Sequence, residues 1–502
     1  MDKIVIIGGG IAGLYCSLKL LEKGYSTTIL EKSNRIGGRI HTINHSNNIS
    51  YESGAARWNN THILLDTLIK ELDLSDKKVD IGKVEHYLPT HLKSPKIIKS
   101  RLPKLVAKLI TRSNMESDQL LRNKTLYQYL STIFSDRDVQ HFVYAFGYTS
   151  EIESLNAYDA IRLFKTSFTN NETYYALHGG LTQLVNKLKN KIIRKGGKIK
   201  TQCNVVSVIN NTTNYKISYT SKKNIKKKII VNRVVLALPK QQLLQFKILK
   251  PFYHLFNQVE GKPLLRIYAK YPVDNNTSWF SKIPKLTTTN ILKFIIPIDP
   301  SNGLIMISYS DARFAEYWMN SNRNGTLKED ITHEVSKCFP NISIPDPEHI
   351  YIHYWEQGVH YYIPGSHSEK TYNALINPLH NLYICNEAFS LNQAWIEGSL
   401  EMSKEVVKNI VDNKGGKPTS TTDNTITLDE VSKHSSLDDG WIILYDKVYN
   451  ITEWIPNHPG GSIILQGLGK DSTSLWESIH GHQSNKEYIL TKLLPKYQIG
   501  VI

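Results

Sequence analysis

The stretch KIVIIGGGIAGLYCSLKLLEKG, residues 3–24, decides the fold. An apolar run leads into Gly8, Gly10 and Gly13, spaced as G-x-G-x-x-G, and a segment with helical periodicity follows, which predicts a strand, a tight turn and a helix. Gly8 permits the turn, Gly10 lets the backbone approach a pyrophosphate, and Gly13 permits close packing of the helix. The next strand-like run, STTILE, ends in Glu31, where an acid accepts hydrogen bonds from ribose hydroxyls. The stretch therefore predicts a dinucleotide-binding βαβ unit.

A second glycine pair follows in RIGGR, residues 35–39. Its Arg39 offers a planar fork for a pyrophosphate. With this segment the chain resembles the flavin-containing amine oxidase family, which includes monoamine, polyamine and L-amino-acid oxidases, over most of residues 1–412. The resemblance extends through ESGAAR (52–57), YALHGGLTQLVNKL (175–188), QCNVVSVI (202–209), VVLALP (234–239) and LYICNEAFSLNQAWIEGSLEMS (382–403).

The resemblance implies FAD as the cofactor and assigns further positions to it. The residues that it places against FAD are Gly54, Ala55 and Arg57, Val205 on the adenine side, Glu387 at the ribityl chain, and Trp395 and Ile396 at the start of a final helix against the isoalloxazine. Members with covalent flavin carry a cysteine where this chain has Val359, so we expect non-covalent FAD. Arg266 stands where family members place a lysine near flavin N5, and it can hold a water molecule but cannot deprotonate.

Family members oxidise amines between two aromatic rings at the flavin face. The matching positions here are His360 and Trp395, and Tyr361 replaces His360 if the loop shifts by one residue. A histidine near neutral pH would help to supply the neutral amine. We therefore expect a small-molecule amine substrate. Two alternatives remain open: a desaturase-type oxidoreductase acting on an apolar substrate, and an electron-transfer flavohaemoprotein without amine oxidase activity.

The motif HPGG, residues 458–461, marks a second site. With VYNIT before it and GKD after it, the sequence resembles the cytochrome b5 family across residues 426–502, which implies a haem b held by two axial histidines. His458 is the first ligand. The second is His480 or His482, and we favour His480 because its spacing from Asp471 requires no local insertion. Two imidazoles leave the iron no open position, so this haem is expected to carry electrons.

The predicted fold class is α/β, with a Rossmann-like FAD-binding domain, a mixed-sheet substrate domain and a helical insertion, followed by a small α+β haem-binding domain. The predicted boundaries are 1–412 for the amine oxidase-like domain, with the helical insertion at about 61–165, and 426–502 for the cytochrome b5-like domain. Residues 413–425, NKGGKPTSTTDNT, contain no apolar side chain and predict a flexible linker.

Composition limits the other possibilities. The chain has 502 residues, a formal net charge of +16 and four cysteines without a C-x-x-C pair, which argues against a disulfide framework or a zinc site. The first residues read as a strand and not as a signal peptide, and no long apolar run predicts a membrane anchor. We expect a cytoplasmic protein with no nucleic-acid partner. An external electron donor or acceptor remains a possible partner.

Overall fold

The structure is a computed structural model that describes residues 3–45, 49–92, 94–168, 172–211, 214–412, 426–481, 486–494 and 497–501. Its internal contacts divide the chain into two compact units, Met1–Lys414 and Gly415–Ile502. The expected linker, residues 413–425, lies outside the described residues.

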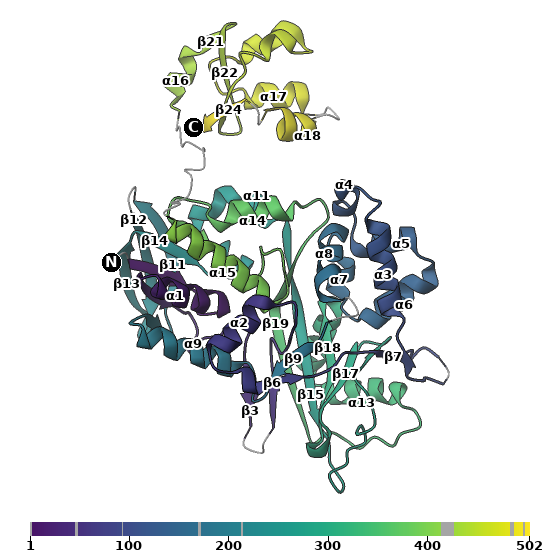
Figure 1. Ribbon diagram of the computed structural model, residues 1–502. Helices are drawn as coiled ribbons and strands as arrows, with labels where there is room; N and C mark the ends of the chain where they lie inside the picture. The colour runs from purple at the N-terminus through teal and green to yellow at the C-terminus, as the bar shows by residue number, and fades with distance from the viewer. Residues whose placement is uncertain are drawn as a thin grey trace. The chain divides into compact units, whose positions relative to one another are not determined.

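A five-stranded parallel sheet forms the centre of the nucleotide-binding region (Figure 1). Its strands in spatial order are β10 (Lys198–Lys200), β2 (Ser26–Leu30), β1 (Lys3–Ile7), β14 (Arg233–Leu236) and β20 (Leu382–Ile384). Ile7 is paired with Leu30 on one side and Leu236 on the other, so the carboxyl ends of the three central strands reach the same edge. Their residues are mostly Val, Ile and Leu because helices cover the sheet.

Three helices pack around this sheet. They are α1 (Ile11–Glu22), which contacts both of the others, α9 (Thr182–Arg194) and α15 (Ile396–Val411). Helix α1 is buried along most of its length, since its residues Ile11–Leu18 and Leu20 are all buried. The predicted strand–turn–helix–strand unit is therefore present, with its glycine turn at the carboxyl edge of the sheet, where doubly wound folds bind their ligands.

A seven-stranded mixed sheet forms the second layer of the large unit. Its strands in spatial order are β19 (His349–Tyr362), β15 (Val259–Lys270), β18 (Leu304–Asp311), β17 (Phe294–Asp299), β16 (Leu286–Thr288), β7 (His86–Leu88) and β8 (Ile98–Lys99). Only β16 and β7 run parallel among these neighbours. Helices α12 (Ala312–Asn324) and α13 (Leu327–Cys338) follow β18, and Trp318 of α12 belongs to the same hydrophobic core as Ile305 of β18.

Six helices fill most of the region in which an insertion was expected. They are α3 (Leu102–Ser113), α4 (Asp118–Arg122), α5 (Leu126–Ile133), α6 (Asp136–Phe146), α7 (Thr149–Glu153) and α8 (Ala157–Ser167). Local sequence explains several of their starts, because the side chains of Ser117, Thr125, Ser135 and Asn156 accept hydrogen bonds from backbone N–H groups of the first turns. The helices begin later than residue 61 suggests: α2 (Ile63–Glu71) packs on α15, and β6 (Lys78–Asp80), β7 and β8 come before α3.

Smaller elements complete the large unit. The strands are β3 (Thr42–Asn44) with β4 (Ser50–Glu52), β5 (Trp58–Asn59) with β9 (Tyr174–Leu177) and β6, and the sheet of β11 (Asn204–Asn211), β12 (Asn214–Ser221) and β13 (Ile225–Val231). The short helices are α10 (Lys240–Leu243), α11 (Tyr253–Phe256) and α14 (Ser368–Ile376).

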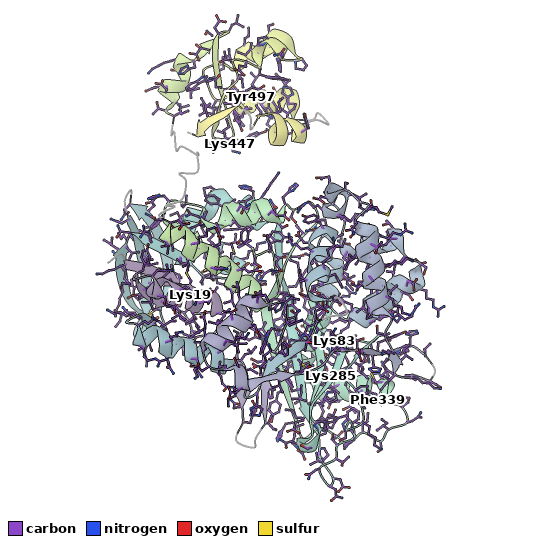
Figure 2. All side chains as sticks on the ribbon, viewed as in Figure 1. Lys19, Lys83, Lys285, Phe339, Lys447 and Tyr497 are labelled. Carbon is purple, nitrogen blue, oxygen red and sulfur yellow. The ribbon has the colours of Figure 1, made fainter. Side chains whose placement is uncertain are left out.

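The second unit has a four-stranded antiparallel sheet with two small cores. The strands in order are β21 (Ser435–Ser436), β22 (Asp439–Leu444), β23 (Lys447–Asn450) and β24 (Gln498–Val501), and the helices are α16 (Leu428–Lys433), α17 (Thr473–His480) and α18 (Lys486–Tyr488). Alternate residues of β22 enter different cores, since Ile442 packs in one and Ile443 in the other. Tyr497, labelled in Figure 2, lies 6.3 Å from the Trp454 ring between centroids.

The predicted fold class is confirmed by this architecture: a Rossmann-like region, a mixed sheet, a helical region and a small α+β unit. No helix among the described residues is both long enough and apolar enough to cross a membrane.

Candidate functional site

A cavity of about 500 Å³ opens at the carboxyl edge of the parallel sheet. It is lined by the glycine turn after β1, the segment 35–40, residues 54–57, Val205 of β11, Arg266 of β15, the end of β19 and the start of α15. The chain thus brings to one cavity fourteen of the fifteen positions that were predicted at the catalytic and FAD sites; thirteen of them line it directly, and Gly13 lies under its floor. The exception is His360.

In the glycine turn after β1, the absence of side chains lets the backbone come close to a ligand. Gly8 has φ of +110°, a conformation that side chains other than glycine rarely adopt, and a Cβ on Gly13 would overlap the carbonyl oxygen of Gly8. A Cβ on Gly10, by contrast, would meet no atom within 4 Å. Gly10 begins α1 without a side-chain cap, so the first N–H groups of that helix remain available to an anion. This cradle fits a pyrophosphate.

Glu31 lies directly after β2, at the side of the glycine turn. Its Oε2 accepts a hydrogen bond from the Gly9 N–H at 2.7 Å, and Oε1 accepts from the backbone N–H of Ser33 at 2.8 Å. These bonds hold the carboxylate at the cavity wall, where each oxygen keeps further acceptor capacity for a ribose hydroxyl.

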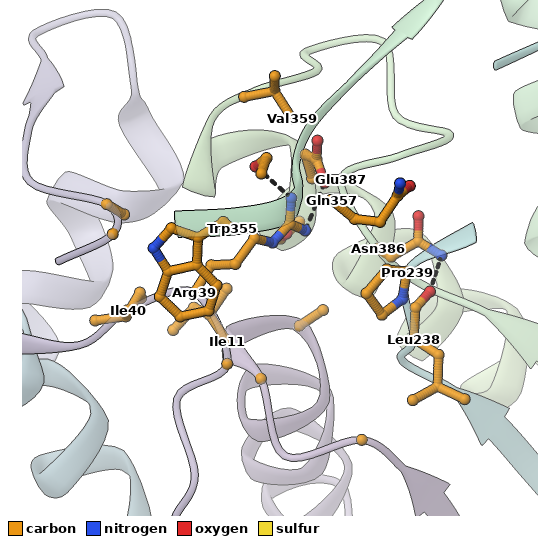
Figure 3. Close-up of a pocket in the computed structure, with 18 of the residues that line it drawn as sticks. Ile11, Arg39, Ile40, Leu238, Pro239, Trp355, Gln357, Val359, Asn386 and Glu387 are labelled. Atoms are coloured by element: carbon orange, nitrogen blue, oxygen red, sulfur yellow. Dashed lines mark hydrogen bonds and ion pairs between the residues drawn. The ribbon is translucent and has the colours of Figure 1, made fainter. Parts of the chain in front are cut away.

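The side chains of Arg39 and Glu387 form an ion pair that joins the segment 35–40 to the loop before α15. The Arg39 guanidinium donates to Glu387 Oε2 at 2.6 Å and to the carbonyl of Gly358 at 2.9 Å, as the dashed lines in Figure 3 show. Burial alone would raise the pKa of Glu387, but Arg39 and His360 outweigh it and lower that pKa to about 2. Glu387 is therefore ionised at any physiological pH.

His360 does not reach the cavity, and this corrects its predicted place in the aromatic cage. Side chains alternate along β19, so Val359 and Tyr361 face the cavity while His360 points to the other side of the strand. There it is fully buried, and its Nδ1–H donates to Glu387 at 3.2 Å. Tyr361, the alternative weighed for this position, lines the cavity and exposes 2% of its surface.

Trp395 immediately precedes α15 and lines the same cavity as Tyr361. The His62 ring packs edge-on against the Trp395 ring at 4.7 Å between centroids. Ile396 begins α15 beside it and also lines the cavity. Tyr361 and Trp395 are thus two aromatic side chains of one cavity, and they come from segments that are adjacent only in the folded chain.

Gly54, Ala55 and Arg57 lie on the opposite stretch of wall. A Cβ on Gly54 would overlap the carbonyl oxygen of Arg39, and the Ala55 N–H donates to that same oxygen at 2.9 Å, so this position must be glycine. Arg57 donates to the Tyr148 hydroxyl at 2.7 Å. Within the described residues no carboxylate lies within ion-pair distance of Arg57, although its side chain lines the cavity.

Arg266 enters the cavity from β15. Its Nη1 donates to the carbonyl of Glu52 at 3.1 Å, and its guanidinium lies 4.6 Å from the centre of the Tyr309 ring. The Nε–H group is buried and has no hydrogen-bond partner among the described residues. An unsatisfied buried donor at the cavity wall fits a water molecule or a cofactor atom.

Asn386 occupies the position where the resembled family has a glycine. Its backbone is not in the left-handed region, so glycine is not needed here. The side-chain amide donates to the carbonyl of Leu238 at 2.8 Å, which ties the end of β20 to the loop after β14 (Figure 3).

Sequence reasoning missed the polar residues at the inner end of the cavity. Glu151 of α7 and Asp311 of β18 line it together with Tyr148 and Tyr309. Glu151 exposes 5% of its surface, and Tyr361 donates a hydrogen bond to it at 3.0 Å. No local motif marks these residues, because α7 and β18 meet only through the packing of the helical region on the mixed sheet.

In the second unit, His458 and His480 face one another. Their ring centroids are 6.2 Å apart. Two imidazole nitrogens that each lie about 2 Å from one metal atom place their ring centres roughly 6 Å apart, so this separation fits a single iron between them. His458 Nδ1–H donates to the carbonyl of Gly461 at 3.2 Å, which leaves Nε2 as the ligating nitrogen. His482 lies outside the described residues.

The surroundings of the two histidines suit a porphyrin. The Trp476 ring stacks on His480 at 4.2 Å between centroids. Apolar side chains gather in the same core, namely Ile442, Leu444, Tyr449, Ile451, Ile455, Leu468 and Leu494, with Trp454, Ile464, Leu465 and Trp476 partly buried against them.

Comparison with known proteins decides the family. The model of the family described as flavin containing amine oxidoreductase matches residues 11–411. The chain belongs to this family. A second model, for the cytochrome b5-like haem/steroid binding domain, matches residues 427–502. The predicted FAD-dependent oxidoreductase with a haem-binding domain is thereby confirmed, and so are its two cofactors, FAD and haem. Non-covalent attachment of FAD stays a prediction.

Individual relatives each match one of the two units of this flavin amine oxidoreductase. Achacin of Lissachatina fulica is 22% identical over 432 residues, which cover 70% of this chain and 80% of achacin. Cytochrome b5 of Candida tropicalis is 45% identical over 76 residues, covering 15% of this chain and 58% of that protein. An acyl-lipid (8-3)-desaturase of Physcomitrium patens is 42% identical over 88 residues, 18% of this chain, and the chain spans only 17% of that desaturase.

Among solved structures, a putrescine oxidase bound to putrescine superposes with a TM-score of 0.68 and 14% sequence identity. The match covers 82% of this chain and 99% of the other. At this identity the likeness shows the fold alone.

Proposed function

We propose that the protein oxidises the C–N bond of a small amine at the cavity of the large unit and passes electrons to the haem of the second unit. The observation that supports an amine is the pair Tyr361 and Trp395, whose rings line one cavity with the glycine turn and the Arg39–Glu387 pair. Two rings form a slot that excludes water and orients a small substrate.

The residues that would hold FAD extend along one wall. They are Gly8, Gly10 and Gly13 at the pyrophosphate, Glu31 at the ribose, Arg39 and Glu387 along the chain between the rings, and Val205 near the adenine. Bound FAD supplies the two-electron acceptor for the oxidation. Arg266, with its unpartnered Nε–H, would hold a water or a cofactor atom at the reacting edge.

Buried charge favours an amine over an apolar desaturase substrate. The cavity wall contains the ionisable side chains Arg57, Arg266, Glu151 and Asp311, and an apolar chain could not replace the water around these groups without a large desolvation cost. Arg57 lacks a carboxylate partner within the described part of the chain, so it favours a substrate that carries an anionic group besides its amine.

His458 and His480 would hold the haem iron in the second unit. A haem held by these two histidines would supply one-electron chemistry and would leave substrate binding to the large unit. An external electron acceptor would then be a partner of the second unit.

The test is anaerobic mixing of the purified holoprotein with a panel of amines and amino acids while the flavin and haem absorption bands are followed together. Bleaching of the flavin band followed by a rise of the reduced haem band supports the proposal. If no amine bleaches the flavin, the amine oxidase assignment is wrong. If the flavin bleaches but the haem stays oxidised, the transfer of electrons to the haem is wrong.

A further inference from the structure

Glu151 is a buried carboxyl group at the substrate end of the cavity. It lies in the middle of α7 and lines the cavity that also contains Tyr361 and Trp395. Its Oε1 accepts a hydrogen bond from the Tyr361 hydroxyl at 3.0 Å. Its Oε2 is shielded from solvent and has no hydrogen-bond partner within the described residues. One hydrogen bond therefore serves a group with several acceptor positions.

The neighbouring carboxylate, Asp311, differs from Glu151 because both of its oxygens accept hydrogen bonds. Asp311 accepts backbone N–H groups of Thr149 and Ser150 at 2.9 and 2.8 Å, and so it fixes the start of α7. Glu151 receives no such backbone hydrogen bond from the part of the chain that the structure describes. Burial and the nearby Asp311 raise the pKa of Glu151 to about 8, against the opposing effects of Tyr361 and Arg57.

Five titratable groups interact electrostatically with Glu151. They are Tyr361 of β19, Asp311 of β18, Arg57 after β5, Tyr148 before α7 and Tyr174 of β9. The tyrosine hydroxyls among them have pKa values raised by burial, so Glu151, with a pKa of about 8, ionises before they do.

We propose that Tyr361 and Glu151 form a proton relay that removes the proton from the substrate's ammonium group before the C–N bond is oxidised. This inference rests on the proposed function. An ammonium nitrogen has no lone pair to assist loss of the neighbouring carbon's hydrogen, so the amine must become neutral first. His360 was the expected group for this task, but it lies behind β19 and bonds to Glu387.

The transfer is balanced without any change of oxidation state. One N–H bond of the ammonium breaks as its proton bonds to the Tyr361 oxygen, and the hydroxyl proton of Tyr361 moves to Oε1 of Glu151. The amine becomes neutral, Tyr361 is unchanged, and the Glu151 carboxylate becomes a carboxylic acid. Tyr361 is the residue that touches the substrate, and Glu151 is the terminal acceptor.

The first experiment measures the rate of anaerobic flavin reduction at low substrate concentration against pH, using the most rapidly oxidised amine of the panel. In the wild type the rate should rise with pH as Glu151 ionises, with a midpoint near its pKa of about 8. Glu151→Gln should lower the rate by about 100-fold near pH 7, the usual contribution of a positioned proton acceptor. The deficit should shrink above the pKa of the free amine, where neutral amine arrives from solution.

Tyr361→Phe keeps the ring and removes the relaying hydroxyl, so it should give the same shifted profile. Glu153→Gln is the matched control: Glu153 lies two residues away on α7, is exposed, and pairs with Arg313. It should behave as the wild type does. A change of packing alone would lower the rate equally at every pH, whereas the relay predicts recovery at high pH.

An infrared titration of the holoprotein without substrate provides a readout apart from activity. Two protonated-carboxyl bands are expected near neutrality, because burial raises the pKa of Glu397 to about 7 and that of Glu151 to about 8. The band that disappears around pH 8 should be present in the wild type and in Glu153→Gln and missing in Glu151→Gln, while the band of Glu397 should be found in all three. If the Glu151→Gln variant does not fold, the kinetic test is made with the Tyr361→Phe variant alone. A wild-type profile in Glu151→Gln or in Tyr361→Phe would overturn the relay, while the absence of flavin reduction by any amine in the wild type would overturn the proposed function itself.

Discussion

Arg39 and Glu387 lie 348 residues apart in the sequence, yet Nη2 of Arg39 is 2.6 Å from Oε2 of Glu387 in the folded chain. The ion pair joins the loop after the dinucleotide-binding unit to the loop that precedes the last helix of the large unit. His360 contacts the same carboxylate from the back of β19, so three segments meet at one charge. This part of the cavity wall is therefore held together by contacts between distant parts of the chain.

Removal of this charge should weaken FAD binding. Glu387→Gln leaves the guanidinium of Arg39 without its partner, and a lost charged hydrogen bond of about 2 kcal/mol corresponds to roughly 30-fold in affinity. Equilibrium ultrafiltration of the holoprotein measures the dissociation constant of FAD. Unchanged affinity would show that Glu387 takes no part in holding the cofactor.

The Arg39–Glu387 ion pair also predicts that the folded protein loses stability in acid. The pKa of Glu387 is lowered from 4.5 to about 2, so the ion pair stabilises the folded protein fully above pH 4.5 and loses its contribution as the pH falls toward 2. Thermal unfolding between pH 6 and pH 2.5 should show a loss of stability below pH 4.5 that is smaller in Glu387→Gln. Equal losses in both proteins would place the acid sensitivity elsewhere.

Substitutions at two glycines of the turn should have different effects: one should lower the stability of the apoprotein, and the other should weaken FAD binding. Gly13→Ala places a methyl group against the Gly8 carbonyl and should cost about 1–3 kcal/mol of stability even without FAD. Gly10 has φ of −74° and open space around its Cβ position, so Gly10→Ala should leave the apoprotein stable but weaken FAD binding. Calorimetric melting of apoprotein and holoprotein distinguishes the two outcomes, and a destabilised Gly10→Ala apoprotein would contradict this division.

FAD should leave the protein on acid precipitation. Val359 lines the cavity without a thiol. Cys203 also lines it, but burial raises the pKa of its thiol, and the other three cysteines are buried away from the cavity. The yellow colour should therefore remain in the supernatant. A flavin peptide in a proteolytic digest of the pellet would show a covalent bond that the side chains near the cavity do not suggest.

The haem ligands can be assigned by substitution. His458→Ala and His480→Ala should each abolish the low-spin bis-histidine spectrum, because the two rings are placed for one iron. His482→Ala is the control and should retain the spectrum. The reverse pattern between positions 480 and 482 would assign the second ligand to His482.

Arg57 should set the preference for an anionic substituent. Arg57→Gln should raise KM for amino acids at least about tenfold, a difference of about 1.4 kcal/mol, and should change KM little for amines without a carboxylate. Arg57→Lys keeps the charge but not the planar fork and should be intermediate. Equal effects on both kinds of substrate would indicate that Arg57 serves the structure of the cavity and not its selectivity.

Local sequence was sufficient for the parts of this protein that depend on short-range chemistry. The glycine turn, Glu31, the RIGGR segment and HPGG each require particular residues at fixed spacing, because backbone must bend sharply or approach a ligand there. The fold class could therefore be predicted from these motifs, and both cofactors from the family resemblances that they carry. Helix starts at Thr125 and Ser135 also follow from local capping.

Only the tertiary structure decided which side chains share the cavity. Val359 and Tyr361 face it and His360 does not, because the pairing of β19 with β15 fixes which side of the strand each residue occupies, and a shift of one residue would exchange them. Glu151 became part of the site because α7 packs at the end of β18. Contacts of this kind depend on which surfaces bury one another, and no local spacing records them.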